Sequence, residues 1–231
     1  LRDNRRDIYV ADVATRQIEK ISTNFGNDTS PRWSPDGNTI AWTAEPNTGH
    51  AVADGTAPSV VLQSRLMLYD VARKTITDTS SPSFDVDAGI PQWAAEGRRI
   101  VFVSGTRAYN EAFACDLSTK GFTQLSNKRT MQFGSQSRNG KTIVVTMDSP
   151  EMAAEVYVTD PTFANFRRLT TTNPQIAELA LGESEVITWK SSDGMEVEGV
   201  LLKPVGLQPG RKYSTLVVAH GGPSGVTTNN F

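Results

Sequence analysis

The sequence predicts a mainly β chain, in which a repeated four-stranded unit is followed by the first strands of an α/β domain. Three observations predict this. Aspartates and hydroxyl residues recur in register through residues 1–172, and a strand–glycine turn–strand pattern recurs between them. Both patterns then stop, and a different arrangement of strands follows at 187–231, with residues 173–186 as a linker.

The first repeat is built on four aspartates, each of which closes a short apolar run. An apolar residue follows six positions after each aspartate, and a serine or threonine follows ten positions after it. Agreement at several offsets in four units indicates repetition of one structural unit. The aspartates are Asp12, Asp70, Asp116 and Asp160, and the hydroxyl residues are Ser22, Ser80, Ser126 and Thr170.

The second repeat lies between the aspartates, at 31–44, 91–104 and 134–147. Each stretch has a turn glycine, an isoleucine three residues later and another apolar residue two positions beyond. This period-two alternation is typical of a strand with one buried face. The glycines are Gly37, Gly97 and Gly140, and the apolar pairs are Ile40 with Trp42, Ile100 with Phe102, and Ile143 with Val145.

One unit therefore holds four antiparallel strands in about 40 to 45 residues, which is typical of a β-propeller blade. Complete blades are expected at 31–80, 91–126 and 131–170, and residues 7–22 supply the two outer strands of a preceding blade. Because propellers close with about four to eight blades, more chain is expected upstream. The Trp-Ser-Pro-Asp-Gly signature at 33–37 resembles the repeats of TolB-like propellers.

One blade is predicted to carry a long loop. Residues 45–64 are rich in glycine, proline, alanine and asparagine and show no clear periodicity. Long loops are often functional, so this one is a candidate functional segment. His50 lies within it, and as a lone loop histidine it is interpreted as solvated.

The region after the repeats predicts a hairpin and then a buried strand. Residues 187–204 alternate on both sides of Ser192-Asp193-Gly194, a strong hairpin turn. Thr215 to Ala219 is a continuous apolar run, as in a strand buried on both faces of a sheet. It ends in His220-Gly221-Gly222-Pro223, where adjacent glycines let the backbone bend sharply and let another group approach.

The order of these features resembles the prolyl oligopeptidase family of serine peptidases, and in particular its acylaminoacyl-peptidase and dipeptidyl-aminopeptidase branch. The resemblance implies an α/β-hydrolase domain and a short peptide substrate, with the propeller restricting access. It also implies that Gly222 donates its backbone N–H to the oxyanion, that Gly221 shapes the loop, and that His220 supports the loop without being the catalytic histidine. No metal or organic cofactor is implied.

The catalytic triad is not expected within this chain. The fold places its nucleophile in Gly-x-Ser-x-Gly, followed by the acid and the histidine, and that motif does not occur here. His50 and His220 are the only histidines, and neither lies where the triad histidine belongs. The sequence therefore predicts a piece of a serine peptidase that has no hydrolytic activity by itself.

Composition excludes several other classes. A net charge of −2 argues against nucleic-acid binding, which needs a strong basic excess on one face. Cys115 is the only cysteine, which rules out an intrachain disulfide and a thiolate zinc site, and it is interpreted as a buried strand residue. No apolar run approaches the roughly 20 residues of a membrane span. The chain begins at Leu1 without a signal-like segment, so its localisation is left open, as is self-association of the whole enzyme.

Two other readings remain open. A TolB-like propeller that binds other proteins without catalysis fits the repeats equally well, but gives no reason for the 187–224 segment. Another α/β hydrolase, such as an esterase, would share the His-Gly-Gly-Pro loop but not the blades that precede it.

Overall fold

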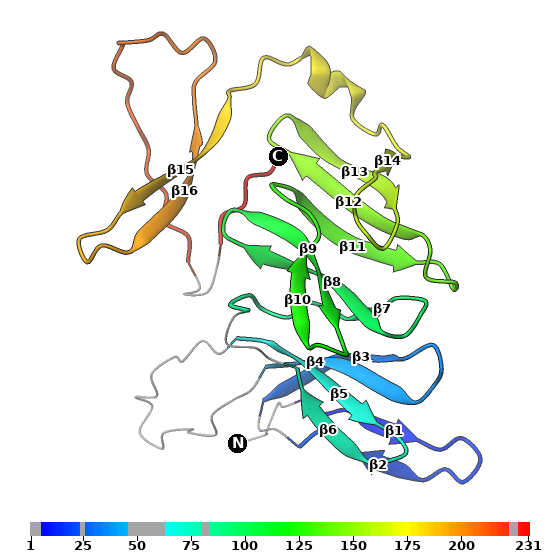
Figure 1. Ribbon diagram of the computed structural model, residues 1–231. Helices are drawn as coiled ribbons and strands as arrows, with labels where there is room; N and C mark the ends of the chain where they lie inside the picture. Colours follow the sequence, from blue (N-terminus) through cyan, green and yellow to red (C-terminus); the bar gives the residue numbers. More distant parts are fainter. Residues whose placement is uncertain (1–5, 24–25, 46–62, 80–83, 222–225) are drawn as a thin grey trace. The chain divides into compact units, whose positions relative to one another are not determined.

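The computed structural model describes residues 6–23, 26–45, 63–79, 84–221 and 226–231 (Figure 1). In these residues regular structure is almost entirely strand, together with one short 3-10 helix, η1 (Pro174–Glu178). Packing divides the chain into two compact units, which are described separately. Unit 1 comprises Leu1–Ser104, Phe113–Gln124 and Arg138–Lys141, and unit 2 comprises Gly105–Ala112, Leu125–Ser137 and Thr142–Phe231.

The predicted blade at 31–80 is confirmed as a four-stranded antiparallel sheet. Its strands pair in chain order, so each strand lies beside the next one in the sequence. Gly37 has a φ of 73°, which explains why the turn between the first two strands needs glycine. The strands are β3 (Asn27–Trp33), β4 (Thr39–Glu45), β5 (Arg65–Asp70) and β6 (Thr75–Asp78).

The predicted blades at 91–126 and 131–170 also have their four strands each. They share one eight-stranded sheet, because Thr130 of β11 pairs in parallel with Asn110 of β9. Gly97 and Gly140 have positive φ values of 69° and 66° at the equivalent turns. The first blade holds β7 (Gln92–Trp93), β8 (Arg99–Thr106), β9 (Tyr109–Asp116) and β10 (Gly121–Gln124), and the second holds β11 (Thr130–Gln136), β12 (Ile143–Ser149), β13 (Met152–Thr159) and β14 (Arg167–Arg168).

The two outer strands predicted within residues 7–22 are β1 (Tyr9–Ala11) and β2 (Ile18–Lys20). They form a separate two-stranded antiparallel sheet. Ile8 and Ile21 beside these strands are buried in a cluster with Ile40, Trp42 and Tyr69 of the next blade. The blade is therefore packed against its neighbour even though only its outer strands are present.

Strand β4 is buried on both faces, which differs from the single buried face that alternation predicts. Trp42 is 1% exposed and packs toward β1 and β2, whereas Ala41 is fully buried on the opposite side. Ala41 lies in a cluster with Trp93 and Phe102 of the following blade. Within unit 1, blades stack face to face, so both faces of a middle strand are removed from water.

The hairpin predicted at 187–204 is confirmed, although it begins three residues earlier, at Ser184, and ends two residues earlier, at Leu202. β15 (Ser184–Lys190) pairs with β16 (Glu196–Leu202), and Gly194 in the turn has a φ of 87°. A Cβ placed on Gly199 would lie 3.0 Å from the ring of Trp189, so the indole covers this glycine from the opposite strand. This contact explains why tryptophan and glycine occur together in the hairpin sequence.

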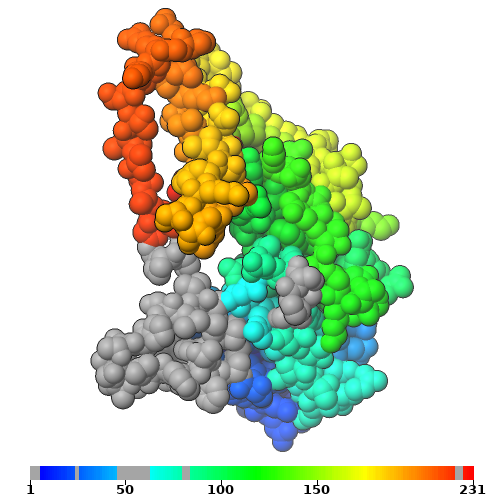
Figure 2. All heavy atoms as spheres, turned by 60° about the vertical axis from the view of Figure 1, so that its left-hand side comes forward, coloured from blue at the N-terminus to red at the C-terminus, as the bar shows by residue number. Residues whose placement is uncertain are grey.

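The prediction of a buried strand from Thr215 to Ala219 is wrong for this structure. The segment is irregular, and Leu216, Val217 and Val218 are 86%, 86% and 77% exposed. Figure 2 shows this red-orange stretch as a thin run of atoms open to solvent on both sides. An apolar, β-branched run becomes a strand only when it finds a neighbour to pair with, and no strand among the described residues pairs with it.

Candidate active site

The candidate oxyanion loop begins at two exposed residues, His220 and Gly221. Nδ1 of His220 lies 3.4 Å from the carbonyl oxygen of Gly221, which is the partner it meets in the described part of the chain. A Cβ on Gly221 would have no atom within 4 Å, so this glycine is not required by crowding. Gly222, the expected oxyanion donor, lies outside the described residues.

The chain that follows the loop is tied down by Asn229. Its backbone N–H donates to the carbonyl oxygen of Ala108 over 2.8 Å, and its side-chain Oδ1 accepts a hydrogen bond from the Ser184 hydroxyl over 2.6 Å. Ser184 is the first residue of β15. Sequence reasoning missed this contact, because an asparagine in a non-repeating tail gives no signal of a partner 121 or 45 positions away, at Ala108 and Ser184.

Cys115 has none of the properties of a nucleophile. It is fully buried in β9, and burial raises the pKa of its thiol to about 11, against a smaller opposing effect of a hydrogen bond with Thr79. The thiolate is the reactive form of cysteine, so a thiol with this pKa is inert near neutral pH. Its interpretation as a buried strand residue is confirmed.

Two buried glutamates stand out as ionisable groups in the core of unit 2. Glu155 is 2% exposed, and its carboxylate accepts hydrogen bonds from the hydroxyl of Thr170 and, over 2.7 Å, from the N–H of Thr172. The Thr170 hydroxyl bond, which is the main cause, lowers the pKa of Glu155 to about 2, with desolvation opposing it. Arg168 adds an ion pair at 2.9 Å.

Glu111 repeats this arrangement one blade earlier. Its carboxylate accepts a hydrogen bond from the hydroxyl of Ser126 and another from the N–H of Arg129 over 3.0 Å. In both blades the same hydroxyl also accepts the N–H of the residue after the glutamate, at 2.9 Å. A buried carboxylate with a shifted pKa, such as that of Glu155, is often catalytic. Glu155 and Glu111 instead accept hydrogen bonds from the residues that follow their blades' outer strands, so they hold those strands together.

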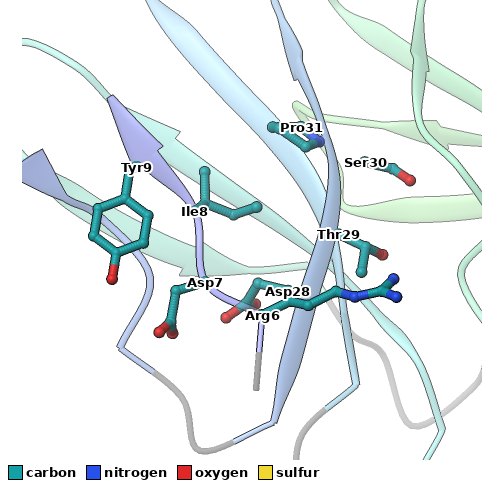
Figure 3. Close-up of a pocket in the computed structure, with 8 residues that line it drawn as sticks. All are labelled: Arg6, Asp7, Ile8, Tyr9, Asp28, Thr29, Ser30 and Pro31. Carbon is teal, nitrogen blue, oxygen red and sulfur yellow. The ribbon is translucent and has the colours of Figure 1, made fainter. Parts of the chain in front are cut away.

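An open groove of about 660 Å³ lies in unit 1, beside β1 and β3 (Figure 3). Two of its carboxylates are already engaged. Asp7 forms an ion pair with Lys20 at 2.8 Å, and Asp28 accepts a hydrogen bond from the indole of Trp42 over 2.6 Å. None of the residues predicted from the sequence for the site lies here. The groove is lined by Arg6, Asp7, Ile8, Tyr9, Asp28, Thr29, Ser30 and Pro31.

Two further findings concern the described residues as a group. Histidine, cysteine and acidic side chains are nowhere gathered there in threes that could hold a metal ion. The helices found there include none long and apolar enough to cross a membrane.

Comparison with known sequences finds two dipeptidyl-peptidases that align with nearly all of this chain. Dipeptidyl-peptidase 5 of Porphyromonas gingivalis is 24% identical over 219 residues, which is 94% of this chain and 30% of the relative. Dipeptidyl-peptidase 5 of Schizosaccharomyces pombe is 23% identical over 241 residues, covering 97% of this chain and 31% of the relative. The chain thus spans about a third of the length of these relatives. No family model matches it.

Two solved structures of differently named proteins share the fold of this chain. TolB from Acinetobacter baumannii superposes with a TM-score of 0.54 at 20% identity, over 87% of this chain and 44% of TolB. A puromycin hydrolase superposes with a TM-score of 0.55 at 17% identity, over 93% of this chain and 32% of the hydrolase. TolB and the puromycin hydrolase therefore share this arrangement of strands with the chain, which confirms the partial β-propeller.

Proposed function

This chain is related to the peptidases of the prolyl oligopeptidase family, and on that premise we propose that the whole protein hydrolyses short peptides by acyl-enzyme chemistry. The observation that carries the proposal is the alignment with dipeptidyl-peptidase 5, which runs through 94% of this chain and so includes both the blades and the segment after them. A propeller alone gives no reason for that second part to align.

In the proposed reaction, a serine outside this chain attacks the substrate carbonyl while a histidine accepts its proton and an aspartate orients the histidine. The backbone N–H of Gly222 donates to the oxyanion that forms. Gly221 shapes the turn, and His220 supports it. A prearranged donor of this kind contributes roughly 3 to 4 kcal/mol to the transition state.

The proposal assigns this chain no triad, so the purified 231 residues are expected to be inactive. The test is release of a chromogenic group from dipeptidyl, acylaminoacyl and longer peptide anilides. The whole protein should cleave at least one class, and the 231-residue chain none of them. Robust turnover by the chain alone would contradict the proposed division of catalytic groups.

The role of the oxyanion loop has its own test in the whole protein. Gly222→Val places a bulky side chain beside the expected oxyanion and should lower kcat by roughly a hundredfold or more, with a smaller change in KM. Ser224→Ala is the matched control in the same loop and should leave kcat nearly unchanged. Equal kcat values in the two variants would remove Gly222 from the reaction.

A second function, protein binding without catalysis, is favoured by one observation: TolB, a propeller protein, shares the fold. The segment from 187 to 224 distinguishes the two functions, because only the peptidase function requires it. If the whole protein binds a protein partner with residues 187–224 deleted and cleaves no peptide when intact, the binding function replaces the peptidase.

Propeller gating is the remaining part of the proposal. The loop at 45–64, of which residues 46–62 lie outside the described residues, is proposed to line the entrance for substrate. Deleting it should widen the range of peptide lengths that the whole protein cleaves. An unchanged length preference would exclude this role.

A further inference from the structure

The turn between β8 and β9 carries an arginine in an unusual backbone conformation. Arg107 has a φ of 54°, in the left-handed region that most residues with a side chain avoid. Its side chain is 67% exposed, so packing does not hold it there. What it meets is the hairpin β15–β16, whose residues follow about 90 positions later in the chain.

The guanidinium of Arg107 lies between two glutamates of β16. Its Nη1 is 2.8 Å from Oε1 of Glu198 and 3.6 Å from Oε1 of Glu196. Glu198 is the better buried of the two, with a side chain 18% exposed, and its Oε2 is buried without a hydrogen-bond partner in the described part of the chain. Arg107 is therefore the cation that compensates a partly desolvated carboxylate.

The next residue of the same turn holds a second segment. The carbonyl oxygen of Ala108, itself 3% exposed, accepts the backbone N–H of Asn229 over 2.8 Å. The side-chain Oδ1 of Asn229 accepts a hydrogen bond from the hydroxyl of Ser184, the residue at which β15 begins. All of these residues belong to unit 2.

We propose that the Arg107–Ala108 turn is a two-point joint, which fixes the β15–β16 hairpin by an ion pair and the tail at 226–231 by a backbone hydrogen bond. The two points differ in chemistry. The ion pair reaches solvent on its Arg107 side and weakens as salt screens it, whereas the hydrogen bond from Asn229 to Ala108 is uncharged. Salt should therefore loosen the hairpin before it loosens the tail. This joint does not depend on the proposed peptidase activity.

Amide hydrogen exchange of the 231-residue chain tests the joint. Arg107→Ala should speed exchange in β15–β16 by roughly 1.5-fold to fivefold, the range expected for an ion pair of which one partner is exposed. The matched control is Arg99→Ala, which removes the ion pair between Glu96 and Arg99, the first residue of β8, but touches neither segment. Equal exchange in β15–β16 for the two variants would overturn the proposal.

Charge reversal separates the ion pair from a general loss of structure. Arg107→Glu and Glu198→Arg should each speed exchange in the hairpin, and the double variant should restore it to within about twofold of the unmodified chain. Salt at 0.5 M, roughly three times physiological strength, should mimic Arg107→Ala in the unmodified chain and add little in that variant. Failure of the double variant to restore slow exchange would exclude the pair as the link.

The second point of the joint is the backbone hydrogen bond from Asn229 to Ala108, and it is supported by the hydrogen bond that the Asn229 side chain accepts from Ser184. Ser184→Ala removes the hydroxyl that holds the Asn229 side chain and should speed exchange at 226–231 more than in the middle of β15–β16. A uniform change across hairpin and tail would contradict two separate attachments.

Discussion

At the scale of single residues, the four repeated aspartates are explained by the turns that follow them. Each carboxylate accepts a hydrogen bond from the backbone N–H of a residue two or three positions later. For example, Thr15 donates to Asp12 over 2.7 Å and Arg73 donates to Asp70 over 2.8 Å. Backbone N–H bonds are the main cause that lowers the pKa of Asp12 and Asp70, whereas hydroxyl bonds from Ser118 and Thr162 are the main cause for Asp116 and Asp160. Aspartate recurs because its short side chain closes a turn, and not because it serves catalysis.

The same turns contain a residue that the sequence did not single out. The fourth residue after three of the aspartates adopts a left-handed conformation, with φ values of 61° at Arg16, 55° at Lys74 and 55° at Lys120. Only glycine takes this conformation without steric cost, so glycine would have marked the position in the sequence. Because these three units have lysine or arginine at this position, the sequence does not indicate the left-handed conformation.

Lys120→Gly is therefore expected to stabilise the chain, even though it removes a side chain. Lys120 is exposed, and relief of the left-handed strain outweighs the greater freedom of glycine in the unfolded state by up to about 1 kcal/mol. Chemical denaturation should show a higher midpoint with an unchanged slope. The control is Lys141→Gly, an exposed lysine for which no positive φ occurs, and it should not stabilise; a lower midpoint for Lys120→Gly would contradict the argument.

At the scale of elements, the hydroxyl ten positions after each aspartate was predicted, and its partner was not. The partner is an acid five positions before the aspartate: Asp7 for Ser22, Glu111 for Ser126 and Glu155 for Thr170. Aligning the repeats shows an acidic residue at this position in three of the four units. The blade at 31–80 has Arg65 there instead, which obscures the pattern. In three of the four units, one acid–hydroxyl pair thus joins the outer two strands of the blade.

Acid should loosen the last blade through Glu155. Because the Thr170 hydroxyl and the turn donors lower its pKa from 4.5 to about 2, the carboxylate contributes its full stabilisation above pH 4.5. That contribution is lost as the pH falls through the native pKa near 2. The unfolding temperature of the unmodified chain should therefore fall more steeply between pH 4.5 and 2 than the unfolding temperature of Glu155→Gln.

The matched control for this pH experiment is Glu151→Gln, which changes an exposed glutamate on the turn that precedes β13. It should keep the steep acid dependence of the unmodified chain. If Glu155→Gln and the unmodified chain lose stability in parallel from pH 4.5 to 2, the hydrogen bonds to Glu155 do not stabilise the blade.

At the scale of the whole molecule, predictability follows from how local the determinants are. Glycine turns, alternating strands and the hairpin at Gly194 depend on neighbours in sequence, and each lies where the pattern predicted it. Stacking of blades on both faces of β4, the joint at Arg107 and the anchoring of Asn229 depend on distant partners, which periodicity does not encode. The oxyanion loop remains a prediction from family resemblance, since Gly222 lies outside the described residues.

The run from Thr215 to Ala219 shows how local composition and distant partners can disagree. Its composition is that of a buried strand, but its surroundings leave it exposed. The adjacent side chains of Leu216, Val217 and Val218 are 86%, 86% and 77% exposed, which makes this segment prone to association through β-pairing. Val217→Lys should therefore reduce self-association of the 231-residue chain without lowering its unfolding temperature, since Val217 makes no buried contact. Light scattering against concentration measures the first effect and calorimetry the second.

Val13 supplies the comparison for that experiment, because it is 94% exposed but stands alone rather than in an apolar run. Val13→Lys adds the same charge to the chain, so any general gain in solubility from charge appears in both variants. A larger fall in scattering for Val217→Lys would assign the association to the exposed run, which then behaves as a strand that lacks its neighbours. Equal scattering in the two variants would show instead that this run is compatible with solvent, and that its strand-like composition has another cause.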